Sequence, residues 1–407
     1  MIASMLGAAN RLPNSFVSGI RKTALIYPAA FLMAVTMGQM TLGMVLYART
    51  VLAVGGTRIG MLAGVWSLTY VFGCLVVRPW FNRVLPRYLI IGSTAVMAGL
   101  VFAMTLTATY WRVMPLYAAF GLVLSLYWPP LMGWVSTGLE DRELGRVLGR
   151  YNMSWCSGAV ISPFLCGWLS ALDARYPLFF AFYLLLFICV SVIGASRWLP
   201  GIGSDRATGA PHDTLPGAKD SSCPLRFPAW VGLYASFFGV GTLTAVFPLV
   251  ALEAWAASET VVGMAFTGRG LANVAGFFLL GRIHGWQYKR LPMVAVQWLA
   301  VAAFAALSLA GSVTIAAGWL AVFGLSGAMS YASSFFHGAA GSLNRARRMA
   351  IHESILAAGL ISGAVAGGWM YEQAASQRVF AGVSLLMAIL TCLQIVVART
   401  VDRNAQG

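Results

Sequence analysis

Long apolar segments separated by short polar turns fill nearly the whole chain. Most intervals without Asp, Glu, Lys or Arg are about 20 residues long, the length that an α-helix needs to cross the hydrocarbon of a bilayer. Backbone polar groups find no water inside lipid, so such segments must be helical. We therefore predict twelve membrane-spanning helices, which lie within residues 23–48, 59–77, 88–111, 113–139, 151–172, 176–196, 227–252, 260–281, 291–344 (two helices), 354–371 and 379–398.

One long polar stretch divides these helices into two sets of six. It is rich in Gly, Pro, Ser and Asp, a composition typical of a flexible linker. The chain is therefore expected to be an all-α membrane protein with two pseudo-symmetric six-helix bundles. Its expected parts are an N-terminal segment 1–22, a bundle 23–198, a linker 199–227, a second bundle 228–398 and a tail 399–407.

The basic residues predict the orientation. If the N-terminus is cytoplasmic, 21 of the 27 Lys and Arg fall on the cytoplasmic side, five on the outer side and one, Arg269, inside the eighth helix. Membrane proteins keep such an excess of Lys and Arg in their cytoplasmic loops. Both termini and the linker are therefore expected in the cytoplasm, with the chain in a bacterial-type inner membrane.

The composition mainly excludes classes of protein. With 59% hydrophobic and only 10% charged residues, the chain cannot cover a soluble globule, which needs about 25% charged residues. The net charge of +15 lies in loops between apolar segments, so it indicates topology and not a nucleic-acid partner. No metal-ligand spacing, nucleotide-binding loop or catalytic signature occurs in the sequence. We expect no catalytic residue, cofactor or metal, and a membrane-embedded enzyme is the least favoured alternative.

The two halves repeat in sequence. At an offset of 203 residues, Gly60-Met61 matches Gly263-Met264 and Phe120-Gly121 matches Phe323-Gly324. At an offset of 201, a Gly-Trp step in helix five recurs in helix eleven. Parallel six-helix repeats with a site at their interface are an arrangement of secondary transporters.

From about residue 23 to 398 the chain resembles the major facilitator superfamily. After helix eight, Gly281 and the pair Lys289-Arg290 match that family's loop motif, which also follows helix two. In that first copy Asn82, followed by Arg83, stands where the family has Asp, so the usual charge latch would be altered. The resemblance implies gating roles for Asn82 and Arg83.

Helix five resembles the family's antiporter signature, with two glycines replaced by other small residues. Small residues three and four apart also let helices pack closely without any link to antiport, and the two interpretations stay open. The matching residues are Gly149, Gly158, Ser162, Pro163, Cys166 and Gly167.

Arg269 is the clearest candidate for solute binding. It lies about 13 Å below the outer end of helix eight, and Asn273 follows one turn later on the same face. A charge at this depth is costly and is a functional candidate by default. Arg269 either binds an anionic group of the solute or is a structural residue held by neighbouring helices.

Other binding candidates lie on helices that line the cavity in the resembled family. They are polar or aromatic side chains suited to an amphipathic solute. Helix one supplies Thr36 and Gln39, helix four supplies Tyr127 and Trp128, and helix ten supplies Tyr331.

A proton-coupled carrier needs a group that changes protonation. The plausible groups are Glu253, His337 and Glu353, and each also fits an ordinary helix-end or interface role. Glu353 follows Arg345, Arg347 and Arg348, which predicts a charge cluster at an inner gate.

The leading hypothesis is a monomeric secondary transporter that moves a small organic solute by alternating access. Proton-coupled export, as in an efflux antiporter, is favoured by the helix-five spacing. An organic-anion carrier or exchanger that uses Arg269 is the alternative within transport. A non-transporting scaffold or sensor with the same fold is the alternative outside it. The expected partners are the solute, the lipid bilayer and protons.

Overall fold

The computed structural model describes residues 14–54, 56–77, 81, 83–198, 220–374 and 377–406, which form helices and no strand. The first half contains α2 (Asn14–Thr50), α3 (Gly56–Val76), α4 (Pro86–Thr105), α5 (Tyr110–Leu124), α6 (Trp128–Ser136), α7 (Asp141–Leu172) and α8 (Tyr176–Trp198). The second half contains α10 (Arg226–Glu253), α11 (Glu259–Arg282), α12 (Arg290–Ser308), α13 (Val313–Ala339), α14 (Arg345–Ala374) and α15 (Val379–Gln406).

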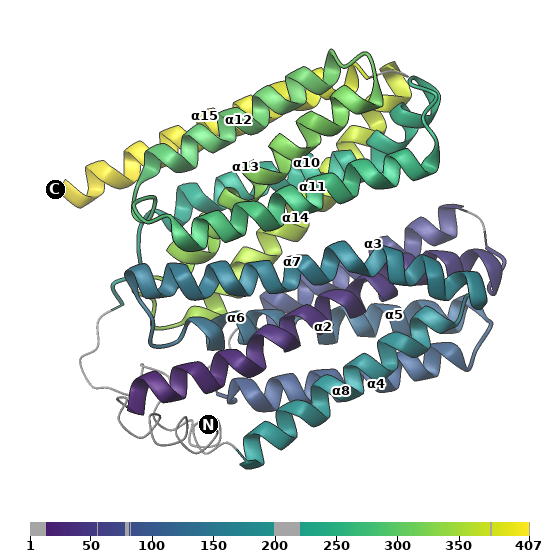
Figure 1. Cartoon of the computed structure of the whole chain (residues 1–407), viewed down its shortest axis with the longest axis horizontal. Coiled ribbons are helices and arrows are strands. Elements are labelled where there is room, and N and C mark those ends of the chain that lie inside the picture. The colour runs from purple at the N-terminus through teal and green to yellow at the C-terminus, as the bar shows by residue number, and fades with distance from the viewer. Residues whose placement is uncertain are drawn as a thin grey trace, which may run out of the picture.

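Twelve spans long and apolar enough to cross a membrane are found in the described residues, with α5 and α6 together forming the fourth. Figure 1 shows the two halves as two bundles, with the start of α2 and the end of α15 at the same end of the molecule. We call this the inner end, following the predicted orientation. The predicted all-α class with twelve membrane helices is therefore confirmed.

Several helices extend beyond the apolar segments that predicted them. α2 begins at Asn14, α7 at Asp141 and α14 at Arg345, and α15 continues to Gln406 within the predicted tail. Charge-free intervals mark only the part of a helix that lies in lipid, whereas its hydrogen bonding continues into water. Residues 1–13 of the expected N-terminal segment and 199–219 of the expected linker lie outside the described residues.

The fourth span is interrupted, although the sequence predicted one continuous helix there. Pro129 and Pro130 have no backbone N–H, so they fit the first turn of a new helix better than a helix interior. At the break, the Tyr127 hydroxyl donates to the carbonyl of Ala29 in α2 at 2.9 Å, and the Ser125 hydroxyl donates to the Leu122 carbonyl at 2.7 Å. The Tyr127 bond holds the break against α2, whereas the Ser125 bond is local to the end of α5.

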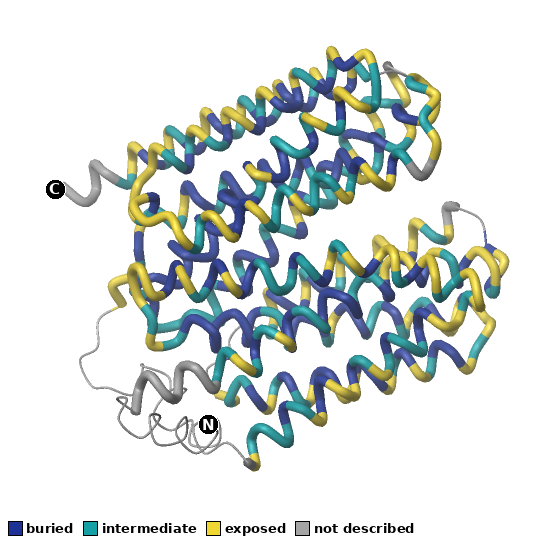
Figure 2. The backbone as a smooth tube through the Cα atoms, viewed as in Figure 1, coloured by how far each residue is buried: buried dark blue, intermediate teal, exposed yellow. Residues whose placement is uncertain are grey.

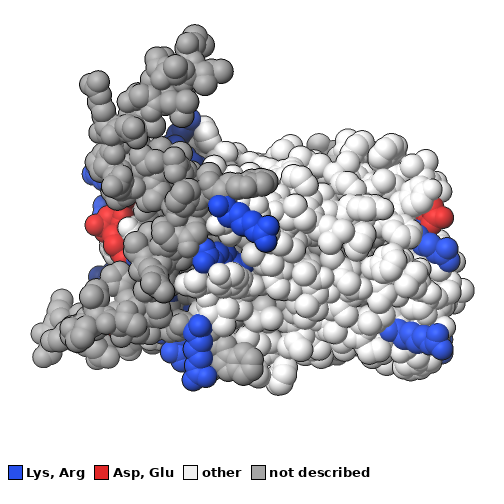
Figure 3. Space-filling view, turned by 90° about the horizontal axis from the view of Figure 1, so that it is seen from below, with Lys and Arg blue, Asp and Glu red and all other residues white. Residues whose placement is uncertain are grey.

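Lipid takes the place of water around the bundle. Phe164, Trp168 and Leu309 are 77%, 60% and 83% exposed, which would be costly in water and is favourable in hydrocarbon. Figure 2 shows exposed positions along the outer helices and buried positions inside each half. In Figure 3 a broad band without Lys, Arg, Asp or Glu separates the charged side chains of the two ends. This band is the membrane-facing surface.

Within each half, glycines bring one pair of helices into close contact. In α7, a Cβ on Gly158 would lie 2.4 Å from the Phe31 carbonyl oxygen of α2. In α14, a Cβ on Gly359 would lie 2.7 Å from the Tyr234 carbonyl oxygen of α10. The sequence repeat at an offset of 201 thus places the same packing contact in both halves.

Candidate functional site

The two halves meet through a small set of helices. α7 contacts α11 and α13 of the second half, and α14 contacts α6 and α3 of the first half. Helices of both halves form this joint, so a change in the angle between the two halves would alter the contacts along it.

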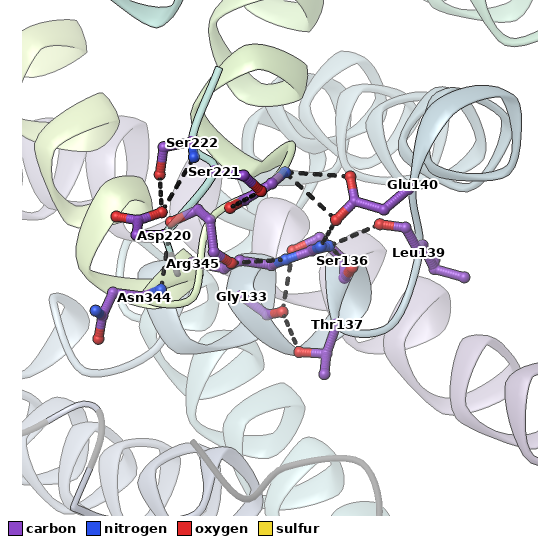
Figure 4. A network of polar contacts seen from close by, with 12 residues as sticks. Gly133, Ser136, Thr137, Leu139, Glu140, Asp220, Ser221, Ser222, Asn344 and Arg345 are labelled. Carbon is purple, nitrogen blue, oxygen red and sulfur yellow. Dashed lines mark hydrogen bonds and ion pairs between the residues drawn. The ribbon is translucent and has the colours of Figure 1, made fainter. Parts of the chain in front are cut away.

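Arg345 fastens the inner end. From the first turn of α14, its guanidinium donates to the carbonyl of Leu139 at 2.9 Å, donates to the carbonyl of Ser136 and pairs with the carboxylate of Glu140 (Figure 4). The same carboxylate accepts the backbone N–H of Gly341 at 3.2 Å. Glu140 and Gly341 are 201 residues apart, so equivalent turns of the two repeats meet here.

The described end of the linker also contacts the inner ends of α13 and α14. Asp220 pairs with Arg348 at 3.3 Å, and the backbone N–H of Cys223 donates to the Ala340 carbonyl at 3.2 Å. Burial raises the pKa of Asp220, but hydrogen bonds from Ser222 and the Arg348 guanidinium outweigh it and leave the pKa below its ordinary value. At neutral pH the carboxylate is therefore charged and keeps its contact with α14. We name Arg345, Glu140, Gly341, Asp220 and Arg348 the inner gate.

Replacing Arg345 with Gln is expected to loosen the inner gate. It leaves the carbonyls of Ser136 and Leu139 without their donor and Glu140 without its cation. Losing such charge-assisted bonds should raise the open fraction about tenfold or more. The measurement is the rate at which a membrane-impermeant thiol reagent modifies Cys223, which is buried beside the gate, with exposed Cys392 replaced by Ser. Arg142→Gln, an exposed position on α7, is the control, and equal rates in the two variants would contradict this role.

Outward of the gate, α7 and α11 touch through glycines. A Cβ on Gly149 would lie 2.6 Å from the Cα of Gly281. Of the residues that match the antiporter signature, Gly149 therefore lies between the halves. Gly158, Ser162 and Cys166 instead pack within the first half, and Pro163 and Gly167 are exposed.

Next comes a buried polar cluster centred on Glu353. The hydroxyl of Tyr70, on α3 of the first half, donates to Glu353 Oε2 at 2.6 Å. His352 Nε2 lies 3.9 Å from Glu353 Oε1, and His352 Nδ1 is bonded to the Ser334 hydroxyl at 2.7 Å. The sequence suggested that Glu353 belongs to a charge cluster with the arginines at the start of its helix. In the structure it does not pair with them. It lies two turns further along α14, where its side chain meets α3.

Aromatic rings form a layer across the joint, outward of Glu353. Trp155 of α7 contacts Tyr331 of α13 at 5.2 Å and Phe277 of α11 at 5.9 Å between ring centroids, and Tyr331 contacts Phe277 at 5.8 Å. Tyr331 also meets the His352 ring edge-on at 4.8 Å. We name Trp155, Phe277 and Tyr331 the aromatic floor.

Arg269 lies two helical turns outward of the floor on α11. Its guanidinium is 5.8 Å from the ring of Phe266, and its Nε is buried without a hydrogen-bond partner. Asn273, one turn further in, accepts a weak hydrogen bond from the Cys156 thiol of α7 at 3.8 Å. Of the carboxylates that the structure describes, none forms an ion pair with Arg269. At this level Val160 of α7 meets Gly270 of α11 across the joint.

Four predicted binding residues lie inside the first half and not at the joint. The Thr36 hydroxyl donates to the Leu32 carbonyl at 2.8 Å, and the Gln39 amide donates to Ser162 at 3.1 Å. Tyr127 bonds to Ala29, as described above, and half-buried Trp128 packs against the Tyr127 ring at 5.4 Å. The bonds of Gln39 and Tyr127 fasten α2 to its neighbours, and the bond of Thr36 satisfies its hydroxyl within α2.

The remaining candidates for coupling and gating are dispersed. Glu253 accepts a hydrogen bond from Tyr371 at the outer end of α10. His337 bonds the Ser333 carbonyl through Nδ1 at 2.7 Å and accepts the Tyr288 N–H at Nε2, so both ring nitrogens are satisfied without a charge. Arg347 is half-buried beside the gate and Arg83 is exposed in the turn before α4, while Asn82 lies outside the described residues.

Sequence reasoning did not identify Tyr70, Trp155, Cys156, Glu140 or Asp220 as members of the joint. Their partners are far away along the chain, and Tyr70 and Glu353 are 283 residues apart. One signal was present: the repeat offset relates the turn at Glu140 to the turn at Gly341, and turns related by a pseudo-twofold axis can meet.

Comparisons with known proteins agree with this architecture. Residues 26–222 match the family model of the Major Facilitator Superfamily, and no curated protein matches the chain. The crystal structure of the human organic anion transporter MFSD10 (TETRAN) is similar with a TM-score of 0.68 and 16% identity, covering 94% of this chain and 100% of that one. The crystal structure of FucP, a Major Facilitator Superfamily transporter in the outward conformation, is similar with a TM-score of 0.65 and 15% identity, covering 94% of this chain and 99% of that one. At these identities the likeness concerns the fold.

Proposed function

We propose, from the premise that this chain is a member of the major facilitator superfamily, that it carries a small organic anion across the membrane in exchange for protons. Its family and fold are those of secondary transporters. The solute class, the coupling ion and the direction are the further steps proposed here.

Arg269 carries the proposal for an anion. A guanidinium stays charged in any protein environment, and burying it without a counter-charge is costly. Here Nε has no partner, and no described carboxylate neutralises the group. A carboxylate, sulfate or phosphate of the solute would supply the missing charge and could bind in a bidentate manner.

The surroundings of Arg269 favour an anion with an apolar body. Phe266 lies beside the guanidinium, and the aromatic floor lies two turns further in. Aromatic rings beside a few polar groups suit a partly apolar organic solute better than an inorganic ion. The similar structure of MFSD10 is described as that of an organic anion transporter, which supports the same class.

Proton coupling and export rest on separate observations. Of the described carboxylates, Glu353 is the only one more than two turns from the end of its helix, and it lies at the joint. The contacts at the inner gate are those expected of a carrier that faces outward, a state in which protons can enter from outside. The helix-five spacing supports export, with Gly149 at the surface where the halves must part.

A screen of ligands and fluxes tests this function. Melting temperatures of the purified protein are measured with anionic, neutral and cationic metabolite pools of similar size. We expect stabilisation by organic anions, and by those with apolar bodies most strongly. In proteoliposomes, flux of a stabilising anion should respond to an imposed pH gradient. Stabilisation by cations alone would contradict the anion class, and flux indifferent to the gradient would contradict proton coupling.

The basic inner loops support an orientation with both termini cytoplasmic in a bacterial-type inner membrane. We propose a monomer, because each chain contains both halves of the joint. Thiol reagents applied from either side of the membrane would test the orientation through Arg142→Cys, an exposed position at the inner end of α7, with Cys392 replaced by Ser.

A further inference from the structure

We propose that Tyr70, Glu353 and His352 form a proton-operated latch between the halves, in which charged Glu353 keeps the inner end closed and protonated Glu353 lets it open. The inference rests on the proton coupling proposed above and adds its site, its positioning residues and its direction. Three features of the cluster support it in turn.

The first feature is that the hydrogen bond of Glu353 spans the two halves. Tyr70 belongs to α3 and Glu353 to α14, and their side chains meet at 2.6 Å in a buried setting. A hydrogen bond to a charged carboxylate is about twice as strong as one between neutral groups. Parting the inner ends separates α3 from α14 and breaks this bond. The charged form therefore favours the closed inner end.

The second feature is that the cluster contains a place for the incoming proton. His352 Nε2 is buried without a hydrogen-bond partner, while Nδ1 of the same ring is bonded to Ser334. Its distance of 3.9 Å from Glu353 Oε1 is too long for a bond to a carboxylate. With the ring proton on Nδ1 and donated to Ser334, Nε2 is an acceptor, and a proton on Oε1 would give Glu353 a donor that faces it. A small rotation of the side chain would then complete the bond within the second half.

The third feature is that the described titratable groups facing Glu353 are neutral, so no cation among them holds its carboxylate in the charged form. The titratable groups that face it are Tyr70 and Cys74 of α3, Tyr151 of α7, Tyr331 of α13 and His352 of α14, all neutral in their ordinary forms. Arg345 is engaged by Glu140 at the gate. Uptake of one proton from water changes the cluster from one negative charge to none. Release of that proton to the inner solution restores it.

The latch predicts opposite effects of its two neighbours on the pH of opening. Tyr70→Phe removes the bond that stabilises the charged form, so the inner end should open at a pH higher by about one unit or more. His352→Phe removes the acceptor of the proton, so opening should require a lower pH. Glu353→Gln mimics the protonated form, so the inner end should be open at every pH tested.

The experiment measures distances between spin labels without any solute. Labels are placed on exposed positions at the inner ends of the two halves, Arg142→Cys and Ile283→Cys, with Cys392 replaced by Ser. The fraction of long distances is followed as the pH is lowered. Tyr371→Phe is the matched control, because it removes a tyrosine–carboxylate hydrogen bond that lies within one half.

The expected result is a pH-dependent opening that Tyr70→Phe and His352→Phe shift in opposite directions and Tyr371→Phe leaves in place. The latch is overturned if the pH dependence persists in Glu353→Gln, or if Tyr70→Phe and Tyr371→Phe behave alike. As a second readout, the infrared band of a protonated carboxylic acid should grow on acidification and be missing from Glu353→Gln. Because no solute is present, this outcome is independent of whether Arg269 binds an anion.

Discussion

Replacing Arg269 with Gln is expected to remove binding of organic anions while leaving the chain folded. Truncating one partner of a buried charge pair costs about 2–5 kcal/mol, so affinity should fall about 30-fold or more. Arg269→Lys keeps the charge but loses the planar fork, so partial binding should remain. The measurement is the anion-dependent rise in melting temperature of each purified variant.

Arg282→Gln is the matched control for Arg269→Gln. Arg282 lies at the inner end of the same helix and also contacts a phenylalanine, with its guanidinium 4.0 Å from the Phe278 ring, but it is exposed. Its loss should leave anion binding in place. Equal stabilisation by anions in the wild type and in Arg269→Gln would show that Arg269 is a structural residue.

Enlarging Gly149 is expected to prevent closure of the inner end. A Cβ at this position would lie 2.6 Å from the Gly281 Cα, and backbone atoms cannot give way as a flexible side chain can. Overpacking costs about 1–3 kcal/mol, which would shift the balance between closed and open states by about five- to 150-fold. Gly149→Ala should have a partial effect and Gly149→Val a larger one.

Spin labels at Arg142 and Ile283 measure this effect, since the inner ends should stay apart at neutral pH in Gly149→Val. Gly167→Val is the control, because Gly167 belongs to the same helix and no atom lies within 4 Å of its added Cβ. Normal closure in Gly149→Val, with an intact melting transition, would mean that α7 and α11 need not approach each other here for the carrier to face outward.

The twelve spans could be predicted because hydrocarbon imposes one strong condition on every segment that crosses it. The ends of the helices could not be predicted from this condition, since α7 and α14 continue through charged residues once they leave lipid. Nor did the apolar pattern predict the break before Trp128. A proline pair in an apolar segment does not by itself distinguish a kink from a new start.

The site was harder to predict, because a stripe of polar residues does not show which neighbour it faces. Arg269, Asn273 and Tyr331 lie at the joint. Thr36 and Gln39, on an equally polar stripe, bond inside the first half. The pairing of Tyr70 with Glu353 depends on how two separate bundles dock, which no local pattern encodes.

Counterflow in proteoliposomes tests the central claim most directly, namely that the joint between the halves carries an organic anion past Arg269. The vesicles are loaded with an unlabelled anion chosen from the melting screen, and uptake of its labelled form is followed. The account predicts saturable uptake that the internal anion accelerates, that Arg269→Gln loses and that Arg282→Gln retains. Uptake no greater than in protein-free vesicles, or equal uptake in Arg269→Gln, would contradict it.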